Sequence, residues 1–395
     1  MTGSWIDTVS LTCAAGAGLA AVRESIALGR TGLQPASGLG ATLDTWIGAV
    51  PGVESLDWPA EFARWDSRNN RLAWLGLQQD GLRARIDAIL RETGRERTGL
   101  IVGTSTSSIG RTEAAYTALD ADGEFAPIYR QPDVHHPHST GAFLGAALGI
   151  GGPVLTVSTA CSSSAKVFAS ADRWLRAGIV DAVVLAGVDS LCRSTLYGFE
   201  SLQLIARGLC RPFDAARDGL NIGEAAAFAV VTRDRTRPGQ PRLAGYGESC
   251  DAWHMSSPHP EGLGAQLALQ AALGRAGLAP ADIGYVNLHG TGTRNNDSVE
   301  SLAMAKTLPA GTPMSSTKGW TGHTLGAAGL VEAVLALEAL ASGLLPANLN
   351  LQTPGNDIAC PILGENTRAA PRYVASNSFG FGGNNCVLVF GRDAA

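Results

Sequence analysis

The chain has 395 residues, of which 45% are hydrophobic and 16% charged, and its formal net charge at pH 7 is −5. A chain of this length can form a large core, and its mildly acidic balance excludes the basic surface that nucleic-acid binding requires. No basic residue precedes the first apolar segment, and we find no apolar run of the roughly 18 to 20 residues that a membrane span needs. We therefore expect a cytoplasmic protein with neither a nucleic acid nor a membrane as its partner.

Apolar stretches rich in β-branched residues alternate with helical patterns along the chain. The predicted strands are residues 99–105, 153–159, 181–188, 225–232, 283–290 and 385–391. The predicted helices, each of which ends on a glycine, are residues 163–178, 263–277 and 327–343. Continuous apolar strands between helices indicate buried, largely parallel sheets with helices on both faces. Because residues 99–190 and 283–391 repeat the order strand, glycine-rich turn, helix and strand, we predict a duplicated α/β unit.

Seven cysteines are scattered along the chain without CxxC pairs, which argues against a disulfide framework and against a zinc site. Most of them fit small, buried hydrophobic positions. Cys161 differs, because in the segment VSTACSSSAKVF it follows a predicted strand and begins a predicted helix. The positive end of the helix dipole is expected to lower the pKa of such a thiol, and small neighbours leave its sulfur accessible. Cys161 is therefore a candidate nucleophile, with a buried structural cysteine as the alternative interpretation.

Two histidines occupy glycine-rich turns between a predicted strand and a predicted helix. His289 ends the strand in VNLHGTGTRNND, and His323 lies in SSTKGWTGHTLGAAG, five residues after Lys318 and nine before Glu332. Functional sites in α/β sheets form beyond the carboxyl ends of the strands, so we expect both imidazoles to lie near the Cys161 thiol. The later segment SNSFGFGGNN lets backbone N–H groups approach a ligand and places aromatic side chains on a glycine hinge.

In this order, and together with RPFDAARDGLNIGEAA and SCDAWHMSSPHPEG, these segments resemble the β-ketoacyl-acyl carrier protein synthases, the Cys-His-His condensing enzymes of fatty acid and polyketide synthesis. The resemblance implies an α/β fold with a thiolase-like, duplicated five-layer α-β-α-β-α architecture. Residues 1–235 would form the N-terminal half with the nucleophilic cysteine, and residues 236–395 the C-terminal half with both histidines, in one compact body.

Some segments indicate a subfamily, and other positions differ from the usual family pattern. TACSSSAKVF, GESCDAWHMSSPHPEG and GHTLGAAG are most similar to ketosynthases of aryl polyene pathways, with standard fatty-acid elongation as the alternative. The family usually has a glycine at the position of Ala225, a threonine at the position of Asn384 and a proline-containing loop near the N-terminus. The pairing of the N-terminal strand is therefore the least certain part of the predicted fold.

The resemblance also assigns chemistry to the candidate residues. Cys161 would receive the acyl chain from a carrier-bound phosphopantetheine thioester. Malonyl-carrier would then lose CO₂, His289 and His323 would stabilise the resulting enolate, and its carbanion would attack the Cys161 thioester. Lys318 and Glu332 would orient the histidines and set their charge state. The reaction is a decarboxylative Claisen condensation that extends the chain by two carbons.

Further residues are assigned to the oxyanion, the substrate and the carrier. Backbone N–H groups of Cys161 and Phe381 would form the oxyanion hole, with the Phe381 ring as a gate. The predicted substrate-binding residues are Thr291, Thr293, Ser256, Phe379 and Ile109, the last at the floor of the acyl pocket. The predicted docking residues for an acidic carrier are Arg64, Arg68, Arg71, Arg130 and Arg207, for which a solvated helix face is the alternative.

The expected partners are acyl carrier protein and a second subunit, in a homodimer or in a heterodimer with a ketosynthase-like chain length factor. Neither a metal nor a resident cofactor is expected, because the phosphopantetheine arm belongs to the carrier. A biosynthetic thiolase would need a second reactive cysteine, and Cys386 lies inside a predicted strand. A non-catalytic chain length factor would lack the thiol that Cys161 supplies. Acyl length, unsaturation and pathway stay open.

Overall fold

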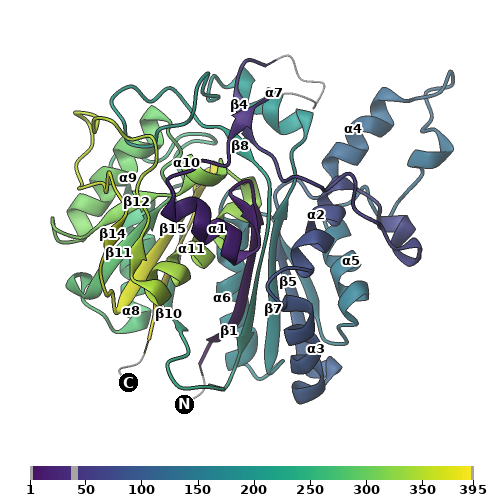
Figure 1. The fold of residues 1–395 in the computed structure, drawn as a ribbon, viewed down its shortest axis with the longest axis horizontal. Coiled ribbons are helices and arrows are strands. Elements are labelled where there is room, and N and C mark those ends of the chain that lie inside the picture. Colours follow the sequence, from purple (N-terminus) through teal and green to yellow (C-terminus); the bar gives the residue numbers. More distant parts are fainter. Residues whose placement is uncertain (1–2, 37–42, 393–395) are drawn as a thin grey trace.

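The computed structural model describes residues 3–36 and 43–392 of the chain. Its main feature is an 11-stranded sheet that divides into two halves (Figure 1). The strand order in the N-terminal half is β6 (Val154–Val157), β5 (Thr98–Gly103), β7 (Ala182–Asp189), β9 (Ala225–Thr232) and β1 (Trp5–Cys13). The order in the C-terminal half is β12 (Met314–Ser316), β11 (Ile283–Leu288), β15 (Tyr373–Gly380), β16 (Asn384–Gly391) and β10 (Arg242–Cys250). The short β2 (Gly16–Ala17) pairs with β1.

The two halves repeat one pattern of strand directions. β5 is parallel to β6 and β7, and β11 is parallel to β12 and β15. β9 and β16 are antiparallel to both of their neighbours. The halves join where β1 pairs with β10, at Trp5 and Arg242. The predicted duplication is confirmed, but the prediction of largely parallel sheets was wrong, because a strand buried on both faces is apolar throughout and its sequence does not report its direction.

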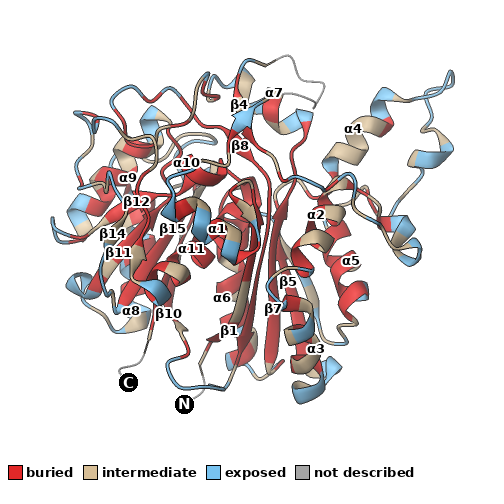
Figure 2. Cartoon of the chain, in the orientation of Figure 1, coloured by how far each residue is buried: buried red, intermediate tan, exposed pale blue. Residues whose placement is uncertain are grey.

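Helices complete five layers around the two halves (Figure 1). The middle layer consists of α6 (Ser163–Arg176) and α11 (Ala328–Ser342), which pack against each other and against strands of both halves. The outer layer of the N-terminal half consists of α2 (Arg68–Leu77), α3 (Leu82–Thr93) and α5 (Ser139–Leu148). The outer layer of the C-terminal half consists of α8 (Leu263–Ala276) and α9 (Arg294–Thr307). Burial is densest in the sheets and the middle layer (Figure 2).

One segment corrects an expectation from the sequence. We expected no apolar run long enough to span a membrane. Residues 325–342 nevertheless have the length and the apolar composition of a membrane-spanning helix. In the fold, 83% of this segment is buried inside the protein, because α11 packs between the two halves of the large sheet. Its apolar surface therefore belongs to the core of the molecule.

The remaining α-helices and strands are short and connect these layers. They are α1 (Leu19–Ala27), α4 (Ile109–Thr117), α7 (Arg193–Ser201), α10 (Lys318–Thr321), β3 (Gln34–Pro35), β4 (Trp46–Gly48), β8 (Ile222–Gly223), β13 (Leu344–Leu345) and β14 (Thr367–Arg368). Helix α4 and the chain that follows it form an arm that projects from the body (Figure 1). Two large hydrophobic side chains of this arm, Tyr116 and Ile128, are each 65% exposed.

Candidate active site

Cys161 lies on the tight connection between β6 and α6. Ala160 adopts a φ of 52°, which is unusual for a residue with a side chain and marks a constrained turn. The Ser163 hydroxyl accepts a hydrogen bond from the backbone N–H of Thr159 at 2.9 Å, which closes the turn at the helix start. A Cβ atom on Gly380 would lie 2.9 Å from the Thr159 carbonyl oxygen, so only glycine allows the C-terminal loop to approach this closely.

The imidazole of His323 is in direct contact with this thiol. Its Nε2 atom lies 3.0 Å from the Cys161 sulfur, although 162 positions separate the two residues in the sequence. The His323 backbone N–H donates to the Asn221 carbonyl oxygen at 2.7 Å, and its own carbonyl oxygen accepts from Gly223 at 3.0 Å. These bonds fix the imidazole on a backbone that is itself almost completely buried. The predicted meeting of thiol and histidine is thus present in the structure.

His289 extends from the carboxyl end of β11 into the same cavity. The buried Glu300 carboxylate accepts hydrogen bonds from the backbone N–H groups of His289 and Gly290, each at 2.8 Å. The His289 and His323 rings lie 5.3 Å apart, centre to centre, at an angle of 86°. Glu300 therefore positions His289 through its backbone. Among the described residues, the Glu300 carboxylate forms no hydrogen bond with the His289 imidazole.

Lys318 and Glu332 form a buried ion pair behind the histidines. The Lys318 ammonium donates to the Glu332 carboxylate and to the His289 carbonyl oxygen, and it lies 3.2 Å from His289 Nδ1. An ammonium can only donate, so Nδ1 must accept and the proton of the neutral His289 ring resides on Nε2. Burial raises the pKa of Glu332 to about 7, while the Lys318 charge lowers it. The pair thus fixes the tautomer of His289.

Burial and charge determine the protonation of the reacting groups. Burial lowers the pKa of both His289 and His323 well below 6.5, and the Lys318 charge lowers it further, so both rings are neutral at neutral pH. Burial also raises the pKa of the Cys161 thiol to about 11, against smaller lowering effects of Lys318 and the Phe381 backbone N–H. The expected lowering of this pKa by the helix was wrong, because the sulfur is desolvated. A neutral thiol faces a neutral imidazole that can accept its proton.

The Phe381 loop covers the thiol from the C-terminal half. The backbone N–H of Phe381 hydrogen-bonds the Cys161 sulfur, so this donor lies beside the atom to which the acyl group would be attached. The Phe381 ring stacks on Phe199 of α7, with ring centres 5.4 Å apart, and Phe199 also lies 6.5 Å from the His323 ring. Sequence reasoning missed Phe199, because no motif surrounds it and tertiary packing alone brings α7 to the site.

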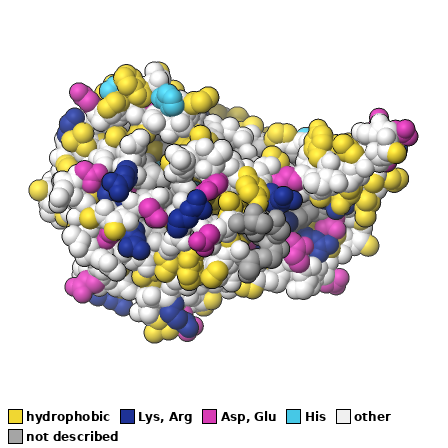
Figure 3. Space-filling view, turned by 90° about the horizontal axis from the view of Figure 1, so that it is seen from above, with side chains coloured by type: hydrophobic (Ala, Val, Ile, Leu, Met, Phe, Trp, Pro, Cys, Tyr) yellow, Lys and Arg dark blue, Asp and Glu magenta, His cyan; other side chains and the backbone are white. Residues whose placement is uncertain are grey.

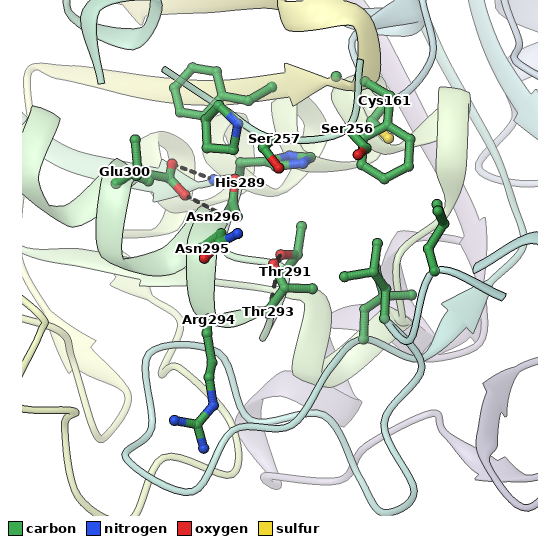
Figure 4. Close-up of a pocket in the computed structure, with 18 of the residues that line it drawn as sticks. Cys161, Ser256, Ser257, His289, Thr291, Thr293, Arg294, Asn295, Asn296 and Glu300 are labelled. Carbon is green, nitrogen blue, oxygen red and sulfur yellow. Dashed lines mark hydrogen bonds between the residues drawn. The ribbon is translucent and has the colours of Figure 1, made fainter. Parts of the chain in front are cut away.

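A cavity of about 450 Å³ connects these groups to the surface (Figure 4). The predicted residues that line it are Cys161, His289, His323, Phe379, Phe381, Thr291, Thr293 and Ser256. The hydroxyl oxygens of Thr291 and Thr293 lie 2.8 Å apart on one wall. Ile109 is not among the lining residues and is 36% exposed at the start of α4, so the structure does not place it at the floor of this cavity.

The predicted docking arginines divide into two groups. Arg68 pairs with the buried Glu224 and with the exposed Glu54, and Arg71 forms a two-point contact with Asp66, so carboxylates of the same chain already engage both guanidinium groups. Arg64, Arg130 and Arg207 are exposed. Arg207 pairs with Glu200, Arg64 lies 3.9 Å from the Asp133 carboxylate, and Arg130 donates to the Phe125 carbonyl oxygen. On the face in Figure 3, acidic side chains lie between the basic ones. Carrier docking stays a prediction for the exposed group, and the geometry gives Arg68 and Arg71 a structural role.

Metal binding has one geometric candidate among the described residues. One ligand atom each of Cys161, His289 and His323 lies within 4.8 Å of the others, which is close enough for a soft metal ion. The ammonium of Lys318, 3.2 Å from His289 Nδ1, opposes a second positive charge at this position. The same three groups suit proton transfer and oxyanion stabilisation, in which neutral imidazoles act as donors and acceptors.

Comparisons with known proteins agree with this geometry. The β-ketoacyl synthase N-terminal domain family matches residues 71–237, and the C-terminal domain family matches residues 241–352. The 3-oxoacyl-(acyl-carrier-protein) synthase 2 of Rhizobium meliloti is 34% identical over 320 residues, which cover 75% of this chain and 74% of the relative. The chain therefore belongs to the β-ketoacyl synthase family and is an acyl-transferring condensing enzyme.

Solved structures extend the likeness over the whole chain. A chain in the complex of a ketosynthase with its chain length factor from Xenorhabdus doucetiae is 37% identical, with a TM-score of 0.90 and coverage of 99% of this chain and 98% of that chain. A β-ketoacyl synthase from Burkholderia phymatum is 28% identical, with a TM-score of 0.86 and full coverage of both chains. The thiolase-like fold expected from the sequence is confirmed.

Two findings contradict the thiolase alternative: the chain belongs to the β-ketoacyl synthase family, and Cys386 is not placed to act as a second reactive thiol. Cys386 is fully buried in β16 and is absent from the residues that line the cavity. Burial raises the pKa of this thiol far above its ordinary value, so it is inert as a nucleophile. The non-catalytic alternative is disfavoured by the thiol and imidazole that lie 3.0 Å apart.

Proposed function

We propose that this chain is the thiol-bearing ketosynthase of an aryl polyene pathway and that it works on acyl carrier protein together with a chain-length-factor-like subunit. The observation that carries the proposal is the Cys161–His323 contact of 3.0 Å in a chain that matches, almost end to end, a chain of a ketosynthase–chain length factor complex. The segments TACSSSAKVF, GESCDAWHMSSPHPEG and GHTLGAAG support the pathway. Standard fatty-acid elongation is the second candidate, favoured by the Rhizobium meliloti relative.

The first half-reaction is acyl transfer to the enzyme. The Cys161 thiol gives its proton to His323 Nε2 as the sulfur attacks the thioester carbonyl of the incoming chain. Backbone N–H groups of Cys161 and Phe381 hold the oxyanion, and each such donor contributes about 3 kcal/mol or more to transition-state stabilisation. The pantetheine thiolate leaves and takes the proton from His323. The acyl chain is then bound to Cys161 as a thioester.

The second half-reaction joins two carbons to that chain. A malonyl group on the carrier places its thioester oxygen against His289 Nε2–H, and the carboxylate leaves as CO₂. The carbanion attacks the Cys161 thioester carbonyl, the bond between the acyl carbon and the sulfur breaks, and the 3-oxoacyl chain leaves on the carrier. Cys161 departs as a thiolate and takes up one proton from the solvent. Lys318 keeps the His289 ring neutral and fixes its proton on Nε2. The neutral donor stabilises the enolate without transferring its own proton to it.

The proposed subunit contact uses the free edge of the N-terminal half. β6 is the last strand in the sheet order, and Leu155 on it is 38% exposed. An exposed, partly apolar edge strand is a surface that pairs with another chain. The arm with the exposed Tyr116 and Ile128 offers further apolar area. We place a second, ketosynthase-like subunit here, in an enzyme of the cytoplasm that needs no resident cofactor.

The test is intact-protein mass after mixing with a panel of acyl-carrier thioesters that includes saturated, conjugated and aryl-primed chains. We expect a mass gain of one acyl group, largest for conjugated chains, and none in Cys161→Ala. Cys386→Ala is the matched control and should be acylated like the wild type. A preference for saturated chains would assign the enzyme to fatty-acid elongation, and acylation of Cys161→Ala would overturn the nucleophile assignment.

A further inference from the structure

The outer part of the cavity carries a basic residue that the proposed steps do not use. Arg294, the first residue of α9, is exposed and lines the same cavity as Cys161 (Figure 4). It is the only lysine or arginine among the lining residues. Its carbonyl oxygen accepts hydrogen bonds from Arg217 and Ser298, but in the described part of the chain its guanidinium forms neither a hydrogen bond nor an ion pair. The charge is therefore available to a ligand.

Acidic groups of the same cavity are engaged elsewhere. Glu300 accepts from backbone N–H groups at the base of the cavity, as described above. Asp251 accepts from the Asn385 side chain at 2.9 Å and from the backbone N–H of His259 at 3.3 Å. Asp218 accepts from the backbone N–H of Arg207 at 3.3 Å. No carboxylate of the described residues thus neutralises the guanidinium, so an anion entering the cavity meets an unpaired positive charge.

The polar groups of the cavity follow a definite order. In Figure 4, Cys161 lies at one end, the Thr291 and Thr293 hydroxyls lie between, and Arg294 lies at the other end. A phosphopantetheine arm carries its groups in the same order, with a thioester, two amides and a phosphodiester. Hydroxyls can donate to and accept from amides, and a guanidinium binds a phosphate through two parallel hydrogen bonds.

We propose that Arg294 binds the phosphodiester of the carrier's arm, so that the outer end of the cavity selects phosphorylated thioesters. The inference rests on the proposed function, because it names the ligand group at the far end of the same site. The sequence offers no motif for this role, since Arg294 follows HGTGT as an ordinary first residue of a helix. Only the shared cavity connects it to the thiol.

The experiment compares two thioesters with the same acyl group, one on phosphopantetheine and one on pantetheine without the phosphate. Acylation of Cys161 is followed by intact mass to give a second-order rate constant for each. We expect Arg294→Ala to lower the constant for the phosphorylated thioester about tenfold, which is the effect of one charge-assisted contact. The constant for pantetheine should stay within about twofold of the wild type, and Arg294→Lys should recover part of the loss.

Arg91→Ala is the matched control, because Arg91 is an exposed arginine on α3 that does not line the cavity. It should leave both constants unchanged. Equal losses with both thioesters in Arg294→Ala, or no loss with either, would overturn the phosphate assignment while the acyl-enzyme still forms. If the wild type is acylated by neither thioester nor by any carrier-bound chain, the proposed function fails, and the inference fails with it.

Discussion

The loops after β5 and β11 occupy equivalent places in the two halves, and each rests on a buried carboxylate. Asp189 accepts from the backbone N–H groups of Ser105 and Thr106 after β5, at 2.8 and 3.1 Å. Glu300 accepts from His289 and the following residue after β11. The same device fixes both loops, but only the second carries a titratable side chain into the cavity. The duplicated fold therefore places the two loops in the same way, and the difference between them is the imidazole of His289.

A second equivalence concerns the connections from the edge strands to the middle helices. Cys161 lies between β6 and α6, and His323 lies between β12 and α11. The two connections bring sulfur and imidazole nitrogen to 3.0 Å across the boundary between the halves. The nucleophile therefore depends on the N-terminal half, and its proton acceptor depends on the C-terminal half. Variants of matched residues in the two halves can separate these contributions.

The largest effect is expected at the buried Lys318–Glu332 ion pair, which lies beside the histidines in the C-terminal half. Lys318→Met leaves the buried Glu332 without its partner, and breaking a buried pair costs about 3–5 kcal/mol of unfolding free energy. Condensation should be lost as well, because His289 loses the group that fixes its tautomer. Urea unfolding and product formation measure the two effects. Lys318→Met with Glu332→Leu should regain much of the stability and none of the activity; a double variant that also regains activity would contradict the role of Lys318.

Much of this site was predictable, because the reacting residues lie in motifs that couple a strand end to a glycine-rich turn. Cys161, His289, His323 and Phe379 all lie where the cavity forms. The pKa direction of the Cys161 thiol was not predictable, because desolvation depends on the loops that cover the sulfur. Phe199 was not predicted either, because only tertiary packing brings α7 to Phe381 and His323. Arg68 looked like a surface residue at helical spacing, and its buried partner Glu224 lies 156 positions away.

Some strands of the fold were predictable from the sequence and others were not. Predicted strands such as 225–232 match the observed ones closely, because their apolar runs are buried on both faces. Strand β10 was missed, since its sequence RLAGYGESC contains three polar or charged side chains besides two glycines. Its glycines are explained only by the fold: a Cβ on Gly247 would lie 1.7 Å from the Ala268 carbonyl oxygen of α8. Such a close helix–strand approach leaves no periodic signal in the sequence.

The next effect compares the two carboxylates directly. Glu300→Gln and Asp189→Asn each place an amide N–H₂ against backbone donors, so each should cost about 1–3 kcal/mol of unfolding free energy. Their kinetic effects should differ. Glu300 holds the His289 loop and also accepts from the Asn377 side chain of β15 at 3.0 Å, so its variant should slow condensation about tenfold. Its hydrogen bonds within the described residues do not reach the Cys161 or His323 loops, so acylation should be spared. Asp189 also accepts from Gly326 at 2.6 Å, close to His323, so its variant should slow acylation. Identical kinetic profiles for the two variants would refute the division of labour.

A smaller effect is expected from pH. The folded-state pKa values of His289 and His323 lie below 6.5, so the unfolded chain binds more protons as the pH falls below 6.5. Stability contributed by the neutral rings is present above pH 6.5 and is lost on acidification, by up to about 1.4 kcal/mol per pH unit for each ring. Urea unfolding at pH 7, 6 and 5 measures the slope. His323→Asn should reduce it, and an unchanged slope would mean that other groups cause it.

The smallest effect is expected where a lysine of the middle layer meets the Phe381 loop. Lys166 of α6 donates to Asn384 Oδ1 at 3.2 Å, which ties the helix behind Cys161 to the loop that covers it. Lys166→Met should slow Cys161 acylation about fivefold, equivalent to the roughly 1 kcal/mol of one part-buried hydrogen bond. Lys306→Met is the control, because Lys306 is an exposed lysine on α9.

Asn384→Ala should have the same effect as Lys166→Met. Because the two side chains share one hydrogen bond, the double variant should be no slower than either single variant. Additive losses would show that each side chain acts alone and that the loop is held by its other contacts.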